Sequence, residues 1–204
     1  MEWPGSVGTK AIYDDEGISV AELPIWSNSF LQSFHQSLLP NAQDLQPTHP
    51  SSWLLPSCGT IKINFDVAFP CGNDHYRVAM VARGSDSVCR WWSIGSFPGK
   101  TKPVDGEAHA ALYAMRIARS KGWDSIILEG DCLQEINPLR LRDVFVPSFG
   151  AYIEGCINMM SFFSRCTFAF IRRQGNSLAH SLATMACMEH ADGISLPSFL
   201  ASGA

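Results

Sequence analysis

A strict alternation of apolar and polar residues marks residues 60–69, the first regular pattern in the chain. One face of this segment carries only apolar side chains, those of Ile61, Ile63, Phe65, Val67 and Phe69. The opposite face carries Lys62, Asn64 and Asp66. A period of two is typical of a β-strand, so we predict a strand over these residues.

Two more strands are predicted directly after the first, over residues 76–83 and 89–97. The segment between them, Gly84-Ser-Asp86, has the composition of a hairpin turn. Three consecutive strands separated by short turns indicate an antiparallel meander.

The apolar period changes to that of a helix over residues 104–121, between Pro103 and Gly122. The apolar stripe consists of Ala108, Ala111, Leu112, Met115 and Ala118. Glu107 lies at the first turn of this buried face. Residues 125–129 form a short apolar run, which we predict to be a strand parallel to its neighbour because it follows a helix closely.

The remaining pattern predicts three helices and one further strand. A short helix follows Asp131 and ends near Pro138, and a longer helix covers 149–163. A strand covers 166–172, and a last helix covers 176–188 with Asn176 as its N-cap. We therefore expect an α/β fold with a five-stranded mixed sheet, three antiparallel strands followed by parallel additions, and helices on its faces.

Composition divides the chain into a leader, a domain and a tail. Residues 1–57 contain six prolines among many Ser, Asn and Gln residues, which predicts a mostly irregular or disordered leader. The domain is expected over 58–188 and the C-terminal tail over 189–204. The net charge is −4, but 58–188 carries 14 basic and 11 acidic residues. A mildly basic domain is compatible with a phosphate-rich partner.

Membrane and secretion signals are absent from the sequence pattern. No run of 18 apolar residues occurs, and the first residues lack the basic-then-apolar pattern of a secretory signal. The seven cysteines include no C-x-x-C pair, so we expect free thiols in a reducing, intracellular compartment. The sequence does not distinguish a nuclear from a cytoplasmic location. We expect the protein to be a monomer.

Three acidic residues stand at the ends of predicted elements. Asp66 and Asp131 end two strands, and Glu107 begins a helix. A single acid in such a place is most often a cap or turn residue. Three of them, where neighbouring strands and a helix start can converge, indicate a site for hard divalent cations. Two such cations a few ångströms apart perform phosphoryl transfer.

Longer motifs around these acids resemble a known family. They are Trp53-Leu-Leu-Pro56, Gly59-x-x-Lys62-x-Asn64-x-Asp66-x-Ala68, Glu107-Ala-x-Ala110-x-x-x-Ala114, Leu128-Glu-Gly-Asp131 and Phe168-x-Phe170-x-Arg172-Arg-x-Gly-Asn176-x-x-Ala179-His180-x-Leu182-Ala183. In this order they resemble plant RNase H-like domains, the reverse-transcriptase-associated RNase H type-1 family. The resemblance covers roughly residues 53–187.

This resemblance implies an RNase H fold and metal-dependent hydrolysis of the RNA strand of RNA–DNA hybrids. It implies two Mg²⁺ or Mn²⁺ ions, with Asp66 shared by both and Glu107 and Asp131 as further ligands. His180 takes the position of a fourth catalytic residue. Arg172, Arg173 and Asn176, in and after the loop before the last helix, are candidates for substrate binding. The alternative for the two arginines is a solvated basic turn.

Two departures from the family pattern weaken this reading. Val67 replaces a glycine, which is harmless if its side chain enters the core and obstructive if it crowds the substrate. His180 replaces the fourth acid, and a neutral imidazole is a poor Mg²⁺ ligand, so the second metal should bind weakly.

Some bacterial members of the family carry a strongly basic protrusion that binds substrate. This sequence lacks one, because residues 137–148 contain only Arg140 and Arg142 as basic residues. The alternative to an active hybrid ribonuclease is therefore a catalytically weak or inactive RNase H-like module of retroelement origin that binds nucleic acid or protein.

Three further residues complete the sequence-based picture. Ala68, two residues after Asp66, argues against an exonuclease on the same fold, which would carry an acid there. Glu129 is either an outer acid of the site or a solvated residue, and we favour the latter. His109 is expected at the surface.

Overall fold

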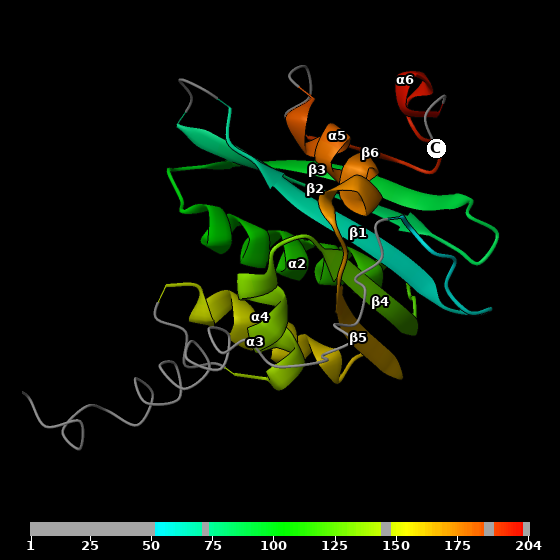
Figure 1. The fold of residues 1–204 in the computed structure, drawn as a ribbon, viewed down its shortest axis with the longest axis horizontal. Coiled ribbons are helices and arrows are strands. Elements are labelled where there is room, and N and C mark those ends of the chain that lie inside the picture. The colour runs from blue at the N-terminus through cyan, green and yellow to red at the C-terminus, as the bar shows by residue number, and fades with distance from the viewer. Residues whose placement is uncertain (1–51, 71–73, 144–147, 186–189, 202–204) are drawn as a thin grey trace, which may run out of the picture. The chain divides into compact units, whose positions relative to one another are not determined.

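The structure is a computed structural model that describes residues 52–70, 74–143, 148–185 and 190–201 (Figure 1). All of them belong to one compact unit that spans residues 47–204. The predicted leader lies outside the described residues apart from 52–57. None of the helices described is both long and apolar enough to cross a membrane.

One mixed sheet of six strands forms the centre of the domain (Figure 1). The strands are β1 (Ile61–Ala68), β2 (His75–Arg83), β3 (Cys89–Pro98), β4 (Ser125–Gly130), β5 (Arg165–Phe170) and β6 (His190–Gly193). Their order is β5-β4-β1-β2-β3-β6. The pairs β1–β2, β2–β3 and β3–β6 are antiparallel, whereas β1–β4 and β4–β5 are parallel. The mixed sheet is confirmed, and the expected count of five strands is corrected to six.

Helices cover both faces of this sheet (Figure 1). They are α2 (Pro103–Ser120), α3 (Leu133–Leu141), α4 (Gly150–Met160), the 3-10 helix η2 (Arg173–Asn176), α5 (Ser177–Thr184) and α6 (Ser198–Ala201). The α2, α3 and α4 helices pack on one face, and α5 packs on the other. Each face therefore has its own hydrophobic core.

The alternation in β1 assigns its residues to these two cores. Ile63, Phe65 and Val67 belong to the larger core with α2. Ala68 belongs to the smaller core, with residues of α5 such as Leu182. Asp66 therefore lies on the α5 face of the sheet, since successive side chains of a strand point to opposite faces.

The polar face of β1 is buried rather than solvated. Lys62 Nζ lies 2.8 Å from Glu129 Oε1 and donates to the Leu54 carbonyl at 2.8 Å. Asn64 donates to Glu129 Oε2 at 3.2 Å and accepts from Arg83 at 2.9 Å. Glu129 is therefore a buried ion-pair partner, and the expectation that it is solvated is wrong. Burial of a charged side chain requires such a partner.

The Trp53 ring packs against the buried polar residues of β1 and β2. The Arg83 guanidinium lies 3.7 Å from the centre of the Trp53 ring. Burial lowers the pKa of Arg83 to about 10, although Glu129 acts against this shift. The contacts of Trp53 and Leu54 attach the residues before β1 to the sheet. Lys62 and Asn64 thus have buried partners within the fold, which gives both residues a structural role.

The α3 helix continues past the point where Pro138 was expected to end it. Proline removes one backbone hydrogen bond from a helix interior. Ile136 and Leu139 on either side of Pro138 are buried in the core. Their packing offsets the lost bond, and the helix ends at Arg142 in a left-handed conformation.

The additional strand β6 covers the edge of β3. Its sequence, His190-Ala-Asp-Gly193, carries none of the β-branched or aromatic residues that signal a strand. Trp92 of β3 donates from Nε1 to the Ser195 carbonyl at 2.7 Å, just beyond β6. The strand is held by these tertiary contacts, which explains why the sequence pattern did not predict it.

Candidate metal centre

Three carboxylates from three elements meet at one end of the sheet. β1 and β4 are parallel neighbours with Asn64 opposite Glu129, so Asp66 and Asp131 follow at the same level. Glu107 comes from the N-terminal part of α2. One carboxylate oxygen from each of the three residues lies within 4.8 Å of the others. The structure thus brings together the acids that the sequence singled out.

The close approach of α2 to β1 depends on Gly106. A Cβ atom at this position would lie 2.9 Å from Val67 Cγ2 and 2.8 Å from Phe69 Cζ. Val67 is buried in the core shared with α2, on the opposite face of β1 from Asp66. It therefore does not crowd the face that carries Asp66. Val67 is accommodated by a glycine in the facing helix.

Burial and repulsion from neighbouring acids make two of these carboxyl groups, Asp66 and Glu107, hard to ionise. Asp66 is fully buried and Glu107 is 8% exposed. Burial, followed by the charge of Asp131, raises the pKa of Asp66 above its ordinary value. Burial, followed by repulsion from Asp66, raises the pKa of Glu107 to about 10. Such a cluster is stabilised by a nearby positive charge.

The cluster fits a hard divalent cation. All three ligands are carboxylates, and Mg²⁺ and Mn²⁺ prefer oxygen donors. Oε2 of Glu107 is buried and has no hydrogen-bond partner among the described residues. A buried acceptor without a donor is costly, and a cation would satisfy it.

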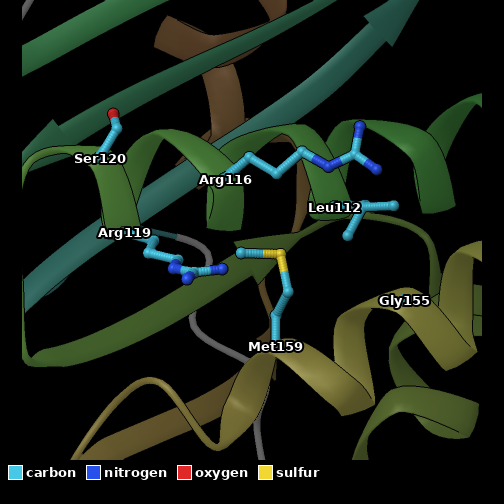
Figure 2. A pocket seen from close by; sticks show the side chains of 6 residues that line it. All are labelled: Leu112, Arg116, Arg119, Ser120, Gly155 and Met159. Carbon is cyan, nitrogen blue, oxygen red and sulfur yellow. The ribbon is translucent and has the colours of Figure 1, made fainter.

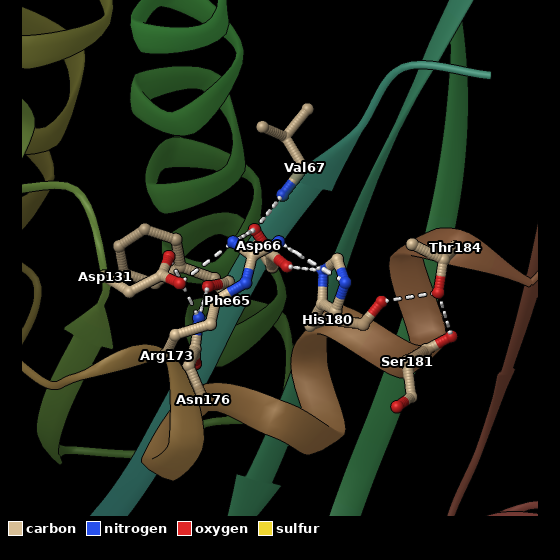
Figure 3. A network of polar contacts seen from close by, with 9 residues as sticks. All are labelled: Phe65, Asp66, Val67, Asp131, Arg173, Asn176, His180, Ser181 and Thr184. Atoms are coloured by element: carbon tan, nitrogen blue, oxygen red, sulfur yellow. Dashed lines mark hydrogen bonds and ion pairs between the residues drawn. The ribbon is translucent and has the colours of Figure 1, made fainter. Parts of the chain in front are cut away.

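Arg173 supplies a positive charge at this cluster (Figure 3). Its Nη1 lies 2.9 Å from Asp131 Oδ2 and 3.9 Å from Asp66 Oδ1. Its Nη2 lies 2.9 Å from His180 Nδ1 and 3.3 Å from Nε2. The guanidinium thus contacts two candidate metal ligands and the imidazole at once. The sequence suggested either a substrate contact or a solvated basic turn for this residue, not an ion pair with the carboxylates.

His180 of α5 contacts the most deeply buried acid of the cluster. Its Nδ1 lies 2.7 Å from Asp66 Oδ2 (Figure 3). A single nitrogen cannot donate to Asp66 and accept from Arg173 at the same time. When Asp66 is ionised, Nδ1–H donates to the carboxylate and the Arg173 guanidinium lies across the ring. Arg77 holds the end of α5 by donating to the carbonyls of Thr184 and Met185.

The other two candidates for substrate binding differ sharply in exposure. Arg172 is exposed beside the cluster. Asn176 is fully buried and donates to the Phe65 carbonyl at 2.9 Å and to Asp131 Oδ1 at 3.5 Å. Asn176 is the N-cap residue of α5, as predicted, but its side chain makes no capping hydrogen bond. It instead ties β1 to Asp131.

Two residues near the cluster were missed or misplaced by sequence reasoning. Glu135 of α3 is fully buried, and neither carboxyl oxygen has a hydrogen-bond partner in the described part of the chain. Burial, followed by repulsion from Asp131, raises the pKa of Glu135. Its place in the first turn of the helix that follows Asp131 was a signal that could have been used. His109, expected at the surface, is buried and lies 2.8 Å through Nδ1 from the Tyr76 hydroxyl.

A cavity of about 520 Å³ lies elsewhere, between α2 and α4 (Figure 2). It is lined by Leu112, Arg116, Arg119, Ser120, Gly155 and Met159. The lining residues from α2 lie in the middle and C-terminal part of that helix, whereas Glu107 lies near its start. The cavity is therefore separate from the carboxylate cluster.

Comparison with protein families shows which family the domain belongs to. The sequence profile of the reverse transcriptase-like family matches residues 64–186. The chain belongs to the reverse transcriptase-like family. No curated protein sequence matches the chain. The family match covers Asp66, Glu107 and Asp131 as well as the loop with Arg173 and the helix with His180.

Solved structures show the fold of this reverse transcriptase-like domain. RNase H1 of the archaeon Halobacterium salinarum superimposes with a TM-score of 0.56 at 21% identity, over 61% of this chain and 94% of that one. The N-terminal RNase H domain of a Mycobacterium tuberculosis protein gives 0.55 at 17% identity, over 61% and 90%. LC11-RNase H1, solved in complex with an RNA/DNA hybrid, gives 0.53 at 15% identity, over 60% and 92%. The predicted RNase H-like fold is confirmed.

Proposed function

We propose that this domain is a ribonuclease of the RNase H type that hydrolyses the RNA strand of RNA–DNA hybrids. The observation that carries the proposal is the meeting of Asp66, Glu107 and Asp131, with one oxygen of each within 4.8 Å of the others. Their position, at adjacent ends of β1 and β4 beside the N-terminus of α2, follows from the fold.

Mg²⁺ or Mn²⁺ would be held by these three residues, and we propose two ions with the second bound weakly. Bound in this way, such ions lower the pKa of a water molecule and stabilise the leaving oxygen of a phosphodiester. Asp66 is the residue we assign to both ions. When Asp66 is ionised, the Nδ1–H tautomer of His180 donates to it at 2.7 Å and so fixes the orientation of this carboxylate. It adds no negative charge for the second ion.

The substrate side of the site is proposed to be nucleic acid. Arg172 and Arg173 are exposed in the segment before α5, where their charges can bind phosphates. Asn176 is fully buried and reaches the Phe65 carbonyl and Asp131, so its part would be to hold the site in shape. We propose that the protein acts as a monomer in a reducing, intracellular compartment.

The experiment uses the full-length protein and a labelled RNA–DNA hybrid in the presence of Mg²⁺ or Mn²⁺. The wild type should cleave the RNA strand, and Asp66→Asn should reduce the rate by at least about a hundredfold because one shared ligand is lost. Leu54→Ala, at an exposed position away from the carboxylates, serves as the control and should keep the wild-type rate. Equal trace cleavage by wild type and Asp66→Asn would overturn the enzymatic proposal.

A second candidate function is a catalytically weak or inactive module of retroelement origin that binds nucleic acid or protein. The observation that favours it is the imidazole of His180, which lies beside Asp66 where the resemblance implies a fourth acid in active enzymes. Hybrid binding without cleavage, measured by fluorescence anisotropy in the same buffers, would support this candidate. Cleavage abolished by Asp66→Asn would exclude it.

A further inference from the structure

Arg173 is the only lysine or arginine within ion-pair distance of Asp66 or Asp131 in the part of the chain that the structure describes. Its Nη1 lies 2.9 Å from Asp131 Oδ2 and 3.9 Å from Asp66 Oδ1. Asp66 is fully buried, and the Asp131 side chain is 6% exposed. Buried carboxylates of this kind need a positive charge nearby, and Arg173 provides one.

The guanidinium and a divalent cation compete for this place. Asp66 and Asp131 are two of the three candidate ligands, and both already interact with Nη1. A divalent cation bound to the same carboxylates would neutralise the charge that attracts Arg173 and would repel the guanidinium.

The side chain of Arg173 is also free to move away from the carboxylates. Its side chain is 56% exposed and starts from the short helix η2. The neighbouring anchor of this segment is Asn176, which is fully buried and stays bonded to the Phe65 carbonyl. The arginine can therefore swing outward while the backbone beneath it keeps its place. Figure 3 shows the Arg173 side chain above the short helix that also carries Asn176.

We infer that Arg173 is the built-in counter-cation of the carboxylate cluster and that a divalent cation binds by displacing it. This inference rests on the proposed metal centre and adds a regulatory property to it. Arg173 raises the divalent-cation concentration at which the site fills. Once displaced, the guanidinium is available to a phosphate group, so cation binding and phosphate binding support one another.

The test is a calorimetric titration of the full-length protein with Mn²⁺, comparing wild type with Arg173→Gln. Removing the competing charge should tighten Mn²⁺ binding by about fivefold, the effect of one partly exposed ion pair. Arg172→Gln is the matched control, since Arg172 is the exposed neighbour and no ion pair joins it to the carboxylates. It should bind Mn²⁺ like the wild type. Arg173→Lys, which keeps the charge without the planar fork, should lie between wild type and Arg173→Gln.

Thermal melting provides a second readout that does not depend on activity. In EDTA, Arg173→Gln should melt below the wild type because its carboxylates lack a counter-charge, and saturating Mn²⁺ should close this gap. Mn²⁺ binding by the wild type together with equal or weaker binding by Arg173→Gln would overturn the inference but not the metal centre. If neither protein binds Mn²⁺, or if Asp131→Asn leaves binding unchanged, the metal centre itself is overturned, and the inference falls with it.

Discussion

His180 Nδ1 lies 2.7 Å from Oδ2 of the fully buried Asp66. This contact suggests what His180 does at the proposed site. An imidazole N–H that donates to a carboxylate fixes its orientation. A carboxylate in the same place would instead add negative charge for a second cation. If the proposed metal centre binds cations, the pair His180–Asp66 should set how strongly a second ion is held.

Replacing His180 by Asp tests this relationship. We expect His180→Asp to bind Mn²⁺ more tightly, by about tenfold, and to cleave an RNA–DNA hybrid faster, because a fourth oxygen ligand is supplied. In EDTA the same variant should be less stable by about 1–2 kcal/mol, since two like charges then face one another. Calorimetry, a cleavage assay and urea denaturation give the three measurements.

His180→Asn is the control for this change. Asparagine is close in size to aspartate and can still donate a hydrogen bond to Asp66, but it adds no charge. It should leave Mn²⁺ affinity near that of the wild type. If His180→Asn and His180→Asp bind Mn²⁺ equally well, the fourth charge is not what limits the site.

The acidic cluster also makes stability depend on pH. The pKa of Glu107 is raised to about 10 from an ordinary value of 4.5, and that of Asp66 is raised as well. A group with a raised folded-state pKa keeps a proton that the unfolded chain releases. Its contribution to stability is full below about pH 4.5 and is lost as the pH rises toward 10. In EDTA, the free energy of unfolding of the wild type should therefore fall between pH 6 and pH 9.

Glu107→Gln measures how much of this pH dependence of stability comes from Glu107. Glutamine does not titrate, so the variant should lose less stability over the same interval, by up to about 1.4 kcal/mol per pH unit. Urea denaturation at several pH values measures the slope. A wild-type slope that Glu107→Gln reproduces would show that Glu107 does not carry the dependence. The variant should also lose hybrid cleavage, because a ligand is removed.

The elements that carry the three acids could be predicted because their apolar periods are long and regular. The alternation before Asp66 and the helical stripe after Glu107 each mark one apolar face, although the polar face of β1 is buried as well. Adjacent strand ends then bring Asp66 and Asp131 together without any further information. The position of Val67 in the core also followed from the alternation alone.

Other features depend on contacts between distant residues, which a local pattern does not encode. Glu129 looked solvated because its partner Lys62 lies in a different strand. Arg173 looked like a loop residue because the carboxylates that attract it come from β1 and the end of β4. The β6 strand has no strand-like composition and is fixed by pairing with β3. In each case a tertiary contact overrides the local signal.

The contact between Val67 and Gly106 leads to a prediction about packing. Gly106→Ala would place a Cβ 2.9 Å from Val67 Cγ2, and we expect it to cost about 1–3 kcal/mol by overpacking and to displace Glu107. Val67→Gly should relieve part of this strain, so the double variant should lose less stability than the two single changes together. Urea denaturation of all four proteins gives the coupling. Additive losses would show that the two positions are independent.

The buried ion pair between Lys62 and Glu129 gives the last prediction. Their side chains are 9% and 6% exposed, and Nζ lies 2.8 Å from Oε1. Lys62→Met leaves Glu129 buried without its cation, and we expect a loss of about 3–5 kcal/mol. Adding Glu129→Leu removes the stranded charge, so the double variant should recover much of that loss, because two apolar side chains can replace a buried pair.

Chemical denaturation of the wild type, both single variants and the double variant measures this coupling. The Mn²⁺ affinity of the double variant should stay close to that of the wild type, since neither residue belongs to the carboxylate cluster. A double variant less stable than Lys62→Met would mean that Glu129 is held in place by the Asn64 amide, which donates to Oε2 at 3.2 Å. In that case the polar network as a whole, rather than the ion pair, would join β1 to β4.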